Sequence, residues 1–305
     1  MRVMLSRPFT NTGPMIFTDR LFKSLKKNYG VEVVDRRPDI YFSVIEYNKN
    51  EVPRGAKVVL RIDGMYWNSK HTNVDRGNRP IFNSIRRADG VVFQSEFCKR
   101  CYFAVMGKIR PDHEVILNAV DWDFIQGIPL ASLPHLPGLV ASAEWRPTKR
   151  PKSVCKGFLV SNIPHHLYMV GKPPDKRVEN DRITWMGVLS QKESIAVMKS
   201  CSHAVHLGKF DPCPNSVIEE VCCGLPVLHT ANGGTPEIVR ENGMMIPEDL
   251  DWDYKPVHGV NNIPPGITAQ YLQQLVEMDR CMPHDDLNIN YAAERYYNFF
   301  IRVLK

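Results

Sequence analysis

The sequence predicts an α/β fold built on doubly wound parallel sheets, and three observations support this class. Short apolar runs suited to buried strands alternate with amphipathic segments along the chain. The chain of 305 residues is long enough for two ordinary domains, and its 43% apolar content is that of a soluble globular protein. The third observation is the stretch 209–239, which reads as loop, helix, buried strand, glycine turn and second helix.

Local signals place the boundaries inside that stretch. Ser216 and Glu219 have the spacing of a capping box, so a helix is predicted to begin near Ser216. Residues 225–228 are predicted to form a short buried strand. The glycines within 232–234 let the backbone approach a ligand, and Thr235 is then expected to cap a second helix.

This arrangement brings two helix amino-termini to the end of one strand. Helix amino-termini present unpaired amides and the positive end of a dipole, so an anionic ligand suits them. The carboxyl edge of an open α/β sheet is the usual place for such a ligand. A phosphate-bearing ligand is the resulting hypothesis.

The same stretch carries a recognisable pattern. Asp211 is followed by seven residues and Glu219, then by Cys-Gly-Leu-Pro-Val at 223–227 and Gly-Gly-Thr-Pro-Glu at 233–237. The pattern resembles the donor-binding signature of the GT-B glycosyltransferases, specifically the large retaining family 4 (glycosyl transferases group 1), although Asp211 replaces a more usual Glu. The resemblance implies two Rossmann-like domains facing across a cleft, and retention of anomeric configuration.

The amino-terminal half is predicted to alternate strands and helices in the same way. Residues 115–121 are similar to the family's Ile-x-Asn-Gly-Val-Asp segment that closes the first domain, with Ala119 in place of the customary glycine. Strands are expected at residues 2–6, 31–34, 39–45, 57–62 and 88–96, and helices at 15–27 and 81–87.

Three prolines within residues 128–138 predict a stiff connection, and the domain boundary is placed there. The predicted domains are 1–130, on the acceptor side, and 139–288, which binds the nucleotide sugar. The resemblance makes 289–305 a candidate for a terminal helix that packs back on the first domain. In the second half, strands are expected at 139–143, 166–170, 182–186 and 202–207, helices at 192–199, 269–278 and 290–304, and loops from 238 to 265.

The resemblance also implies which residues bind the donor. Lys149 matches the family's diphosphate-binding Lys, but Glu144 stands where the partner Arg is normal, so Arg146 is proposed to act from a shifted position. Solvent-exposed charge is the alternative for this basic run. Glu219 should accept hydrogen bonds from the ribose and Asp211 from the sugar. The remaining donor-binding candidates are Gly13, Leu189, Asn215 and Ser216.

Asp63 follows the predicted strand 57–62 in an Arg-Ile-Asp-Gly segment that is similar to a subgroup of the family. It would stand where many relatives carry a histidine near the reacting sugar, so Asp63 and Asp211 are the catalytic candidates. A buried aspartate that caps the next turn is the alternative reading of Asp63.

The acceptor side is predicted from the loops that follow. Tyr66, Trp67 and Ser95 are candidates for contact with the acceptor. The basic residues of the next loop are a candidate acceptor surface, although a solvated loop explains them equally well; they are Lys70, His71, Arg76 and Arg79.

Composition narrows the class of partner only in part. The net charge of +6 suits anionic partners, but it is spread too widely to indicate nucleic acid, and a charged membrane surface is equally open. No stretch has membrane-spanning length and the first residues do not read as a signal peptide, so a cytoplasmic protein is expected. The eight scattered cysteines are expected to be reduced thiols, mostly buried.

Three functions follow as hypotheses. The first is a metal-independent retaining glycosyltransferase that uses a UDP- or GDP-sugar and a glycan, lipid-linked or protein acceptor, with no cofactor. Metal independence is what the resemblance implies. The second has the same donor chemistry, with a modified base in DNA as the acceptor. The third is a protein that binds sugar nucleotides without catalysis.

Overall fold

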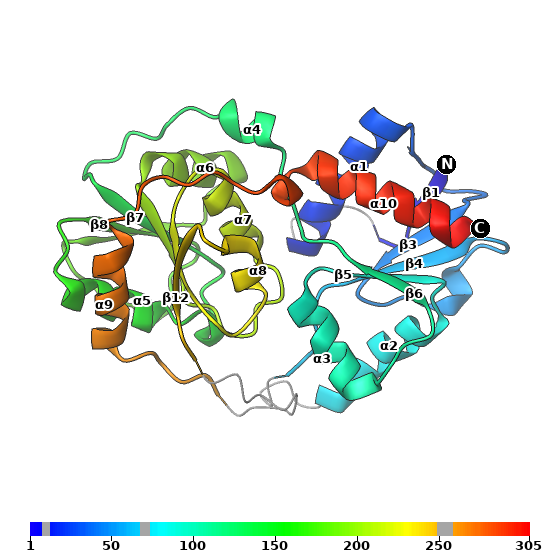
Figure 1. Cartoon of the computed structure of the whole chain (residues 1–305), viewed down its shortest axis with the longest axis horizontal. Coiled ribbons are helices and arrows are strands. Elements are labelled where there is room, and N and C mark those ends of the chain that lie inside the picture. Colours follow the sequence, from blue (N-terminus) through cyan, green and yellow to red (C-terminus); the bar gives the residue numbers. More distant parts are fainter. Residues whose placement is uncertain (8–12, 68–73, 249–258) are drawn as a thin grey trace. The chain divides into compact units, whose positions relative to one another are not determined.

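The structure is a computed structural model that describes residues 1–7, 13–67, 74–248 and 259–305. Within these residues, two six-stranded sheets consist of parallel strands connected through helices, which confirms the predicted α/β class with two doubly wound sheets. The described chain divides into two compact units (Figure 1). The first contains residues 1–121 and 285–305, and the second contains residues 122–248 and 260–284.

The sheet of the first unit has the strand order β2-β1-β3-β4-β5-β6. Its central strands are apolar and buried along almost their whole length, because each has a strand on both sides and helices over both faces. The strands are β1 (Arg2–Leu5), β2 (Glu32–Val33), β3 (Ile40–Val44), β4 (Lys57–Ile62), β5 (Gly90–Phe93) and β6 (Asp112–Val115).

Two helices cover each face of this sheet. One core cluster packs under α1 (Gly13–Tyr29) and α10 (Ile289–Leu304), and the other under α2 (Val74–Arg87) and α3 (Glu96–Met106). Two short 3-10 turns are also present, η1 (Lys49–Glu51) and η3 (Asp285–Leu287).

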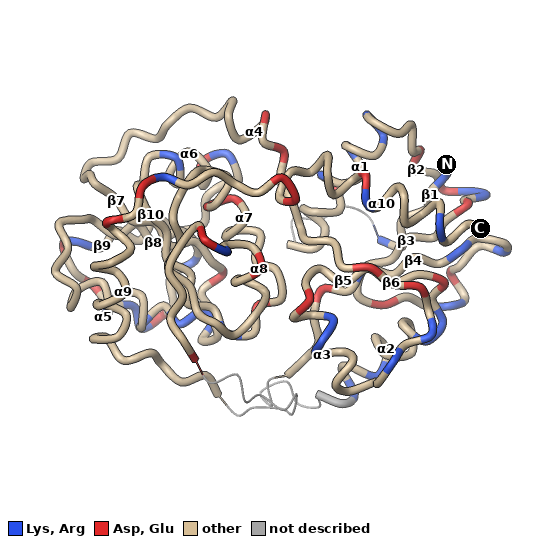
Figure 2. The backbone as a smooth tube through the Cα atoms, in the orientation of Figure 1, with Lys and Arg blue, Asp and Glu red and all other residues tan. Residues whose placement is uncertain are grey.

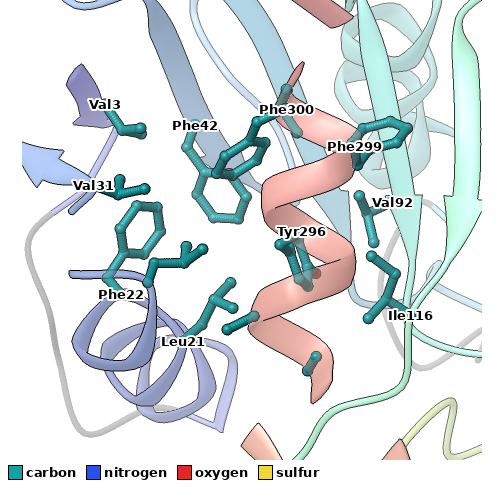
Figure 3. Packing of buried hydrophobic residues seen from close by; sticks show 14 of the residues in the cluster. Val3, Leu21, Phe22, Val31, Phe42, Val92, Ile116, Tyr296, Phe299 and Phe300 are labelled. Atoms are coloured by element: carbon teal, nitrogen blue, oxygen red, sulfur yellow. The ribbon is translucent and has the colours of Figure 1, made fainter. Parts of the chain in front are cut away.

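The last helix of the chain is part of the core of the first unit (Figure 3). The ring of Phe42 on β3 lies 5.2 Å from that of Phe22 on α1 and 6.0 Å from that of Phe300 on α10. Tyr296 and Phe299 of α10 are fully buried beside them. Burying a side chain of this size stabilises the fold by roughly 1.5–3 kcal/mol, so α10 contributes substantially to the stability of this unit.

Two predictions in this unit are wrong in detail, and strand β6 was not predicted. The strand predicted at 88–96 ends at Phe93, because Ser95 starts helix α3 by accepting a hydrogen bond from the amide of Cys98 (3.0 Å). Helix α2 begins at Val74 and continues through Pro80, where a later start was expected. Strand β6 precedes the segment 115–121, of which only the first residue is in a strand.

The sheet of the second unit has the strand order β12-β11-β10-β7-β8-β9. Strand β11 begins after Pro226 and not at residue 225, because proline has no amide to donate to the ladder. Strand β12 lies at the edge, in a part of the chain predicted to be loop. The strands are β7 (Gly138–Ser142), β8 (His166–Val170), β9 (Ile183–Gly187), β10 (His203–His206), β11 (Val227–Thr230) and β12 (Gly243–Ile246).

Helices again lie on both faces, with α5 and α9 packed against each other over the larger core cluster of this unit. Helix α5 was not predicted; it begins at Pro151, and proline suits the first turn of a helix. The helices are α4 (Trp122–Gln126), α5 (Pro151–Ser161), α6 (Gln191–Ser200), α7 (Asn215–Cys222), α8 (Thr235–Val239) and α9 (Pro265–Leu275), with the 3-10 turn η2 (Pro147–Lys149).

Hydrogen bonds from helix α6 hold the proline-containing segment 128–138 against the second unit. The ammonium of Lys199 donates to the carbonyls of Gln126 (3.0 Å) and Ile128, and Ser200 donates to the carbonyl of Ala131 (2.9 Å).

All eight cysteines are free thiols, six of them buried. None of the helices in the described ranges is both long and apolar enough to cross a membrane.

Candidate donor-binding site

The candidate site lies at the carboxyl edge of the second sheet. Strands β7, β10 and β11 are parallel neighbours, so the loops that follow them leave the sheet at one edge. The loop after β7 contains Lys149, the loop after β10 contains Asp211, and the loop after β11 contains Gly233. Three segments that are far apart in the sequence therefore meet there.

Lys149 and Asp211 form an ion pair, in which the ammonium donates to Oδ2 of the carboxylate. The two side chains are only 20% and 16% exposed, so the pair is largely removed from water. Nε2 of the buried His206 lies 3.7 Å from the same carboxylate oxygen. Two groups predicted separately from the sequence, one for the diphosphate and one for the sugar, are in contact.

The charges of this cluster follow from its burial. Burial, and next the positive charge of Arg146, lower the pKa of Lys149 to about 8. Burial and the nearby Lys149 hold the pKa of His206 well below its usual range, so this imidazole is neutral at physiological pH. The burial and neutrality of His206 indicate a structural role.

The backbone of Asp211 is fixed by the glycine turn. Its carbonyl accepts from the amide of Gly234 (2.8 Å), and the preceding Phe210 donates to the carbonyl of Asn232 (3.0 Å). Gly233 has a φ of +142°, and a Cβ atom added there would lie 2.7 Å from the carbonyl oxygen of Asp211. The close approach that requires glycine here is to the carbonyl of Asp211, and the predicted approach of this backbone to a ligand stays a prediction.

Helix α7 begins one residue before the predicted start, and the capping box expected between Ser216 and Glu219 does not form. Because Pro214 is the N-cap, Ser216 is already the second helical residue and its hydroxyl is not in a capping position. Glu219 is instead turned toward α6, where it accepts from the amide of Gln191 (2.9 Å). Thr235 likewise is the first residue of α8 and not its cap.

Glu220 is a residue of this region that the sequence analysis missed. It is fully buried, and within the described residues neither of its carboxyl oxygens has a partner at good hydrogen-bond geometry, the backbone of Ser142 being the nearest donor. Burial, and next the charge of Glu219, raise the pKa of Glu220 well above its ordinary value, although Ser142 and Lys149 oppose the shift. A signal was available, because Glu220 lies three residues after Val217 and therefore on the apolar face of the predicted helix.

The remaining donor-binding candidates have less enclosed positions. Arg146 is 65% exposed and forms an ion pair with Glu144, the residue that stands in the family's usual arginine position. Leu189 is half-buried in the connection between β9 and α6, and Asn215 is the half-buried first residue of α7. Gly13 is the exposed first residue of α1, in the other unit.

Asp63 lies at the carboxyl end of β4, near the centre of the first sheet. The guanidinium of the buried Arg61 donates to Oδ1 of Asp63, and the amide of Gln94 donates to its backbone carbonyl. Arg61 also donates to Oδ1 of Asn118 (2.6 Å). The alternative reading of Asp63 as a buried turn cap is not what the contacts show, because its carboxylate pairs with an arginine.

The acceptor-side candidates occupy different environments. Tyr66 is 44% exposed, and its backbone amide and carbonyl both bond to the side chain of Asn78 (2.8 and 2.7 Å). Trp67 is half-buried at the limit of the described residues. Ser95 is fully buried and caps α3. Arg76 and Arg79 are exposed on α2, whereas Lys70 and His71 lie outside the described residues. Figure 2 shows basic positions along α2.

The sequence contains two Asp-Trp-Asp tripeptides, at 121–123 and 251–253, so the expectation of metal independence has no support from a lack of Asp-x-Asp motifs. The second lies within residues 249–258, outside the part of the chain that is described. Among the described residues, no group of three or more His, Cys, Asp or Glu side chains is placed to hold a metal ion. Metal independence stays a prediction.

Residues 154–253 match the family described as Glycosyl transferases group 1. This match includes Asp211 and Glu219 and confirms the predicted resemblance to glycosyl transferases group 1 over this part of the chain, whereas family 4 and its retaining mechanism stay predictions. A comparison with curated proteins finds no match.

Several solved structures resemble almost the whole chain. HepE from Anabaena, in complex with UDP and glucose, has a TM-score of 0.63 and 13% identity, and the match covers 99% of this chain and 96% of HepE. A trehalose-6-phosphate protein from E. coli, bound with UDP-2-fluoro glucose, has a TM-score of 0.67 and 9% identity over 98% and 99% of the two chains. AviGT4, a glycosyltransferase involved in avilamycin A biosynthesis, has a TM-score of 0.61 and 14% identity over 99% and 98%. The fold is GT-B, as predicted.

Proposed function

We propose that this protein, which has a GT-B fold and a group 1 match over residues 154–253, is a retaining glycosyltransferase. It moves a sugar from a nucleotide diphosphate sugar to a hydroxyl of a glycan, lipid-linked or protein acceptor. The observation that carries the proposal is the meeting of Lys149 with Asp211 at the carboxyl edge of the second sheet.

The leaving group explains why a buried cation is needed. When the bond between sugar and nucleotide breaks, negative charge develops on the diphosphate, and fixed positive charge aimed at it lowers the barrier. Lys149 supplies an ammonium in a largely buried position, where an electrostatic interaction is stronger than in water. Arg146 is exposed and can turn toward the same group, and the amino-terminus of α7 adds the positive end of a helix dipole. These groups supply the charge that a metal ion would otherwise provide.

The two acidic residues account for recognition of the donor. Asp211 accepts hydrogen bonds from hydroxyls of the transferred sugar, and Glu219 accepts them from the ribose. Glu219 accepts from the side-chain amide of Gln191 on α6, and α7 has no side-chain cap, so its carboxylate faces away from the end of its own helix. A donor analogue that lacks one of these hydroxyls leaves a buried carboxylate unpaired, and such contacts therefore discriminate strongly.

Two of the similar structures were solved with UDP or a UDP-sugar, which supports UDP as the first nucleotide to test. GDP-sugars are the alternative. No nucleophile is proposed. The acceptor classes named above and a modified base in DNA share the same donor chemistry, and the acceptor therefore has to be identified by transfer assays.

The test is thermal stabilisation by a panel of UDP- and GDP-sugars, with UDP and GDP alone as controls. A ligand that binds only the native state raises the melting temperature, by an amount equivalent to about 2.7 kcal/mol at a hundred times its Kd. We expect one donor family to stabilise the protein selectively, and Glu219→Gln to lose that stabilisation. Glu241→Gln is the matched control, because Glu241 is 75% exposed in the same unit.

Stabilisation without turnover in the presence of candidate acceptors would favour the sugar-nucleotide-binding protein. Transfer to duplex DNA with strong salt dependence would favour the DNA acceptor. A well-folded protein that no nucleotide sugar stabilises would contradict the proposal.

A further inference from the structure

Arg61 is a fully buried charge in the first unit, on strand β4, whose other buried residues are apolar. Removing a charged group from water costs several kcal/mol unless other groups compensate, so a buried arginine requires partners. Asp63 is the negative charge that pairs with it. Asn118 and Gln94 accept from its NH2 group at 2.6 and 3.2 Å, and its guanidinium carbon lies 4.7 Å from the centroid of the Phe17 ring.

These partners come from four separate segments of the first unit. Phe17 is on α1, Gln94 follows β5, Asn118 follows β6, and Asp63 follows β4 itself. Gln94 is fixed in turn by the amide of Asn118 (3.3 Å) and donates to the backbone carbonyl of Asp63. The guanidinium is therefore contacted by residues of several segments. It fixes Asp63 in two ways, directly through the side chain and indirectly through Gln94, which bonds to the backbone of Asp63.

The carboxylate of Asp63 is constrained on one side and open on the other. Oδ1 accepts from Arg61, whereas Oδ2 makes no hydrogen bond with any residue that the structure describes. The side chain of Asp63 keeps 17% of its surface exposed, while that of Arg61 keeps none. The open oxygen lies at the carboxyl edge of a parallel sheet, where ligands of open α/β sheets bind.

We propose that Arg61 is a positioning residue, which fixes Oδ1 of Asp63 so that Oδ2 can accept a hydrogen bond from a hydroxyl of a bound sugar. The inference rests on the proposed glycosyltransferase function. The hydroxyl belongs either to the transferred sugar or to the acceptor, and the two sources have the same chemistry at this oxygen.

The surroundings of Asp63 make Arg61 its main electrostatic partner. Burial raises the pKa of Asp63, and Arg61 opposes that shift. Among the described residues, the other titratable groups beside Asp63 are Cys98 and Tyr102 of α3, whose pKa values burial raises well above their ordinary range. Both are uncharged at neutral pH, so removing Arg61 removes the charge that favours the ionised carboxylate.

The experiment compares Arg61→Met and Arg61→Lys with the wild-type protein in the transfer assay. We expect Arg61→Met to lower kcat by about 10-fold to 100-fold, the size expected for a hydrogen bond to a charged group. The acid limb of its pH profile should shift to higher pH, because Asp63 becomes easier to protonate. Arg61→Lys keeps the positive charge and should restore part of the activity. A raised acceptor KM would assign the hydroxyl to the acceptor, and a weakened donor Kd would assign it to the donor sugar.

The double variant Arg61→Met/Asp63→Asn separates positioning from general structural damage. If Arg61 acts through Asp63, the double variant has the kcat of Asp63→Asn alone. A further loss in the double variant, or an unchanged kcat and pH profile in a folded Arg61→Met protein, would overturn the inference. Should Arg61→Met not fold, Asn118→Ala removes one anchor of the guanidinium and is expected to shift the pH profile in the same direction; an unchanged profile would overturn it.

A readout independent of catalysis distinguishes this inference from the proposed function. The pKa of Asp63 can be measured by carboxyl ¹³C NMR, with Asp63→Asn to assign the signal. Arg61→Met, or Asn118→Ala in its place, should raise that pKa, and an unmoved pKa would overturn the inference. Absence of transfer with every donor would contradict the proposed function alone.

Discussion

Lys149 and Asp211 lie 62 residues apart in the sequence, and their side chains form a largely buried ion pair. In the proposed function they contact different parts of one donor, since Lys149 faces the diphosphate and Asp211 faces the sugar. A donor therefore has to replace their mutual contact. Phosphate oxygens compete with Asp211 for the ammonium, and sugar hydroxyls then satisfy the carboxylate.

Donor affinity should fall as the pH rises past about 8. Because the pKa of Lys149 is lowered to about 8, its amine is protonated well below that pH and becomes neutral above it. A diphosphate binds the charged form, so Kd should be flat near pH 6.5 and increase toward pH 9.5. Titration calorimetry at several pH values measures this. Lys149→Arg is the matched control, because arginine stays protonated throughout and should remove the dependence.

Replacement of Asp211 should separate the sugar from the nucleotide. Asp211→Asn removes the competitor of the diphosphate for Lys149, so the affinity for UDP or GDP alone should be maintained or tightened. The affinity for the complete sugar nucleotide should weaken by about 10-fold or more, because the contacts to the sugar are lost. Asp175→Asn, at an exposed position in the same unit, is the control. If the affinities for the nucleotide alone and for the sugar nucleotide weakened equally, Asp211 would not be the residue that contacts the sugar.

A methyl group at Gly233 should damage the site through its backbone. The added Cβ would lie 2.7 Å from the carbonyl oxygen of Asp211, and the φ of +142° is strained for any other residue. Gly233→Ala should lower the free energy of unfolding by about 1–3 kcal/mol and weaken donor binding. Gly266→Ala is the control: there is open space around Gly266, which lies in α9, and alanine is favoured in helices, so it should not destabilise. Urea unfolding of the two variants measures the difference.

Glu220 should make the folded state less stable as the pH rises. Its pKa in the folded protein is well above the ordinary value, so between the two pKa values the native state binds more protons than the unfolded state. The free energy of unfolding then decreases with increasing pH. Glu220→Gln cannot ionise and should show a shallower decrease above pH 5, whereas Glu241→Gln should follow the wild type. If the free energy of unfolding depended on pH in the same way in all three proteins, the raised pKa of Glu220 in the folded state would be contradicted.

The sequence predicted the parts of the fold that local rules govern. Strand β4 was placed at its observed bounds, and the signature around Asp211 and Glu219 was found because its spacing is fixed by a loop, a helix turn and a glycine turn. Helix α3 was missed, because Ser95 ends an apolar run and caps a helix at the same time. Local patterns predict the elements well, but at a boundary one residue can belong to the patterns of two elements.

The contacts of the site could not be predicted, because they depend on tertiary structure. Nothing in the sequence indicated that Lys149 would pair with Asp211, or that Glu219 would bond to Gln191 and not to its own helix end. The buried charge of Arg61 left a weak signal, since an arginine inside an apolar strand needs partners. The partners of Arg61 come from the loops that follow three neighbouring strands, and the sequence does not show that these loops meet.

The most direct test is a crystal structure of the protein with the nucleotide sugar that stabilises it most. The account predicts the diphosphate within hydrogen-bond distance of Lys149, ribose hydroxyls on Glu219 and sugar hydroxyls on Asp211, with the ion pair of Lys149 and Asp211 replaced by these contacts. A nucleotide bound elsewhere, or one bound while that ion pair is intact and its ribose does not contact Glu219, would contradict it.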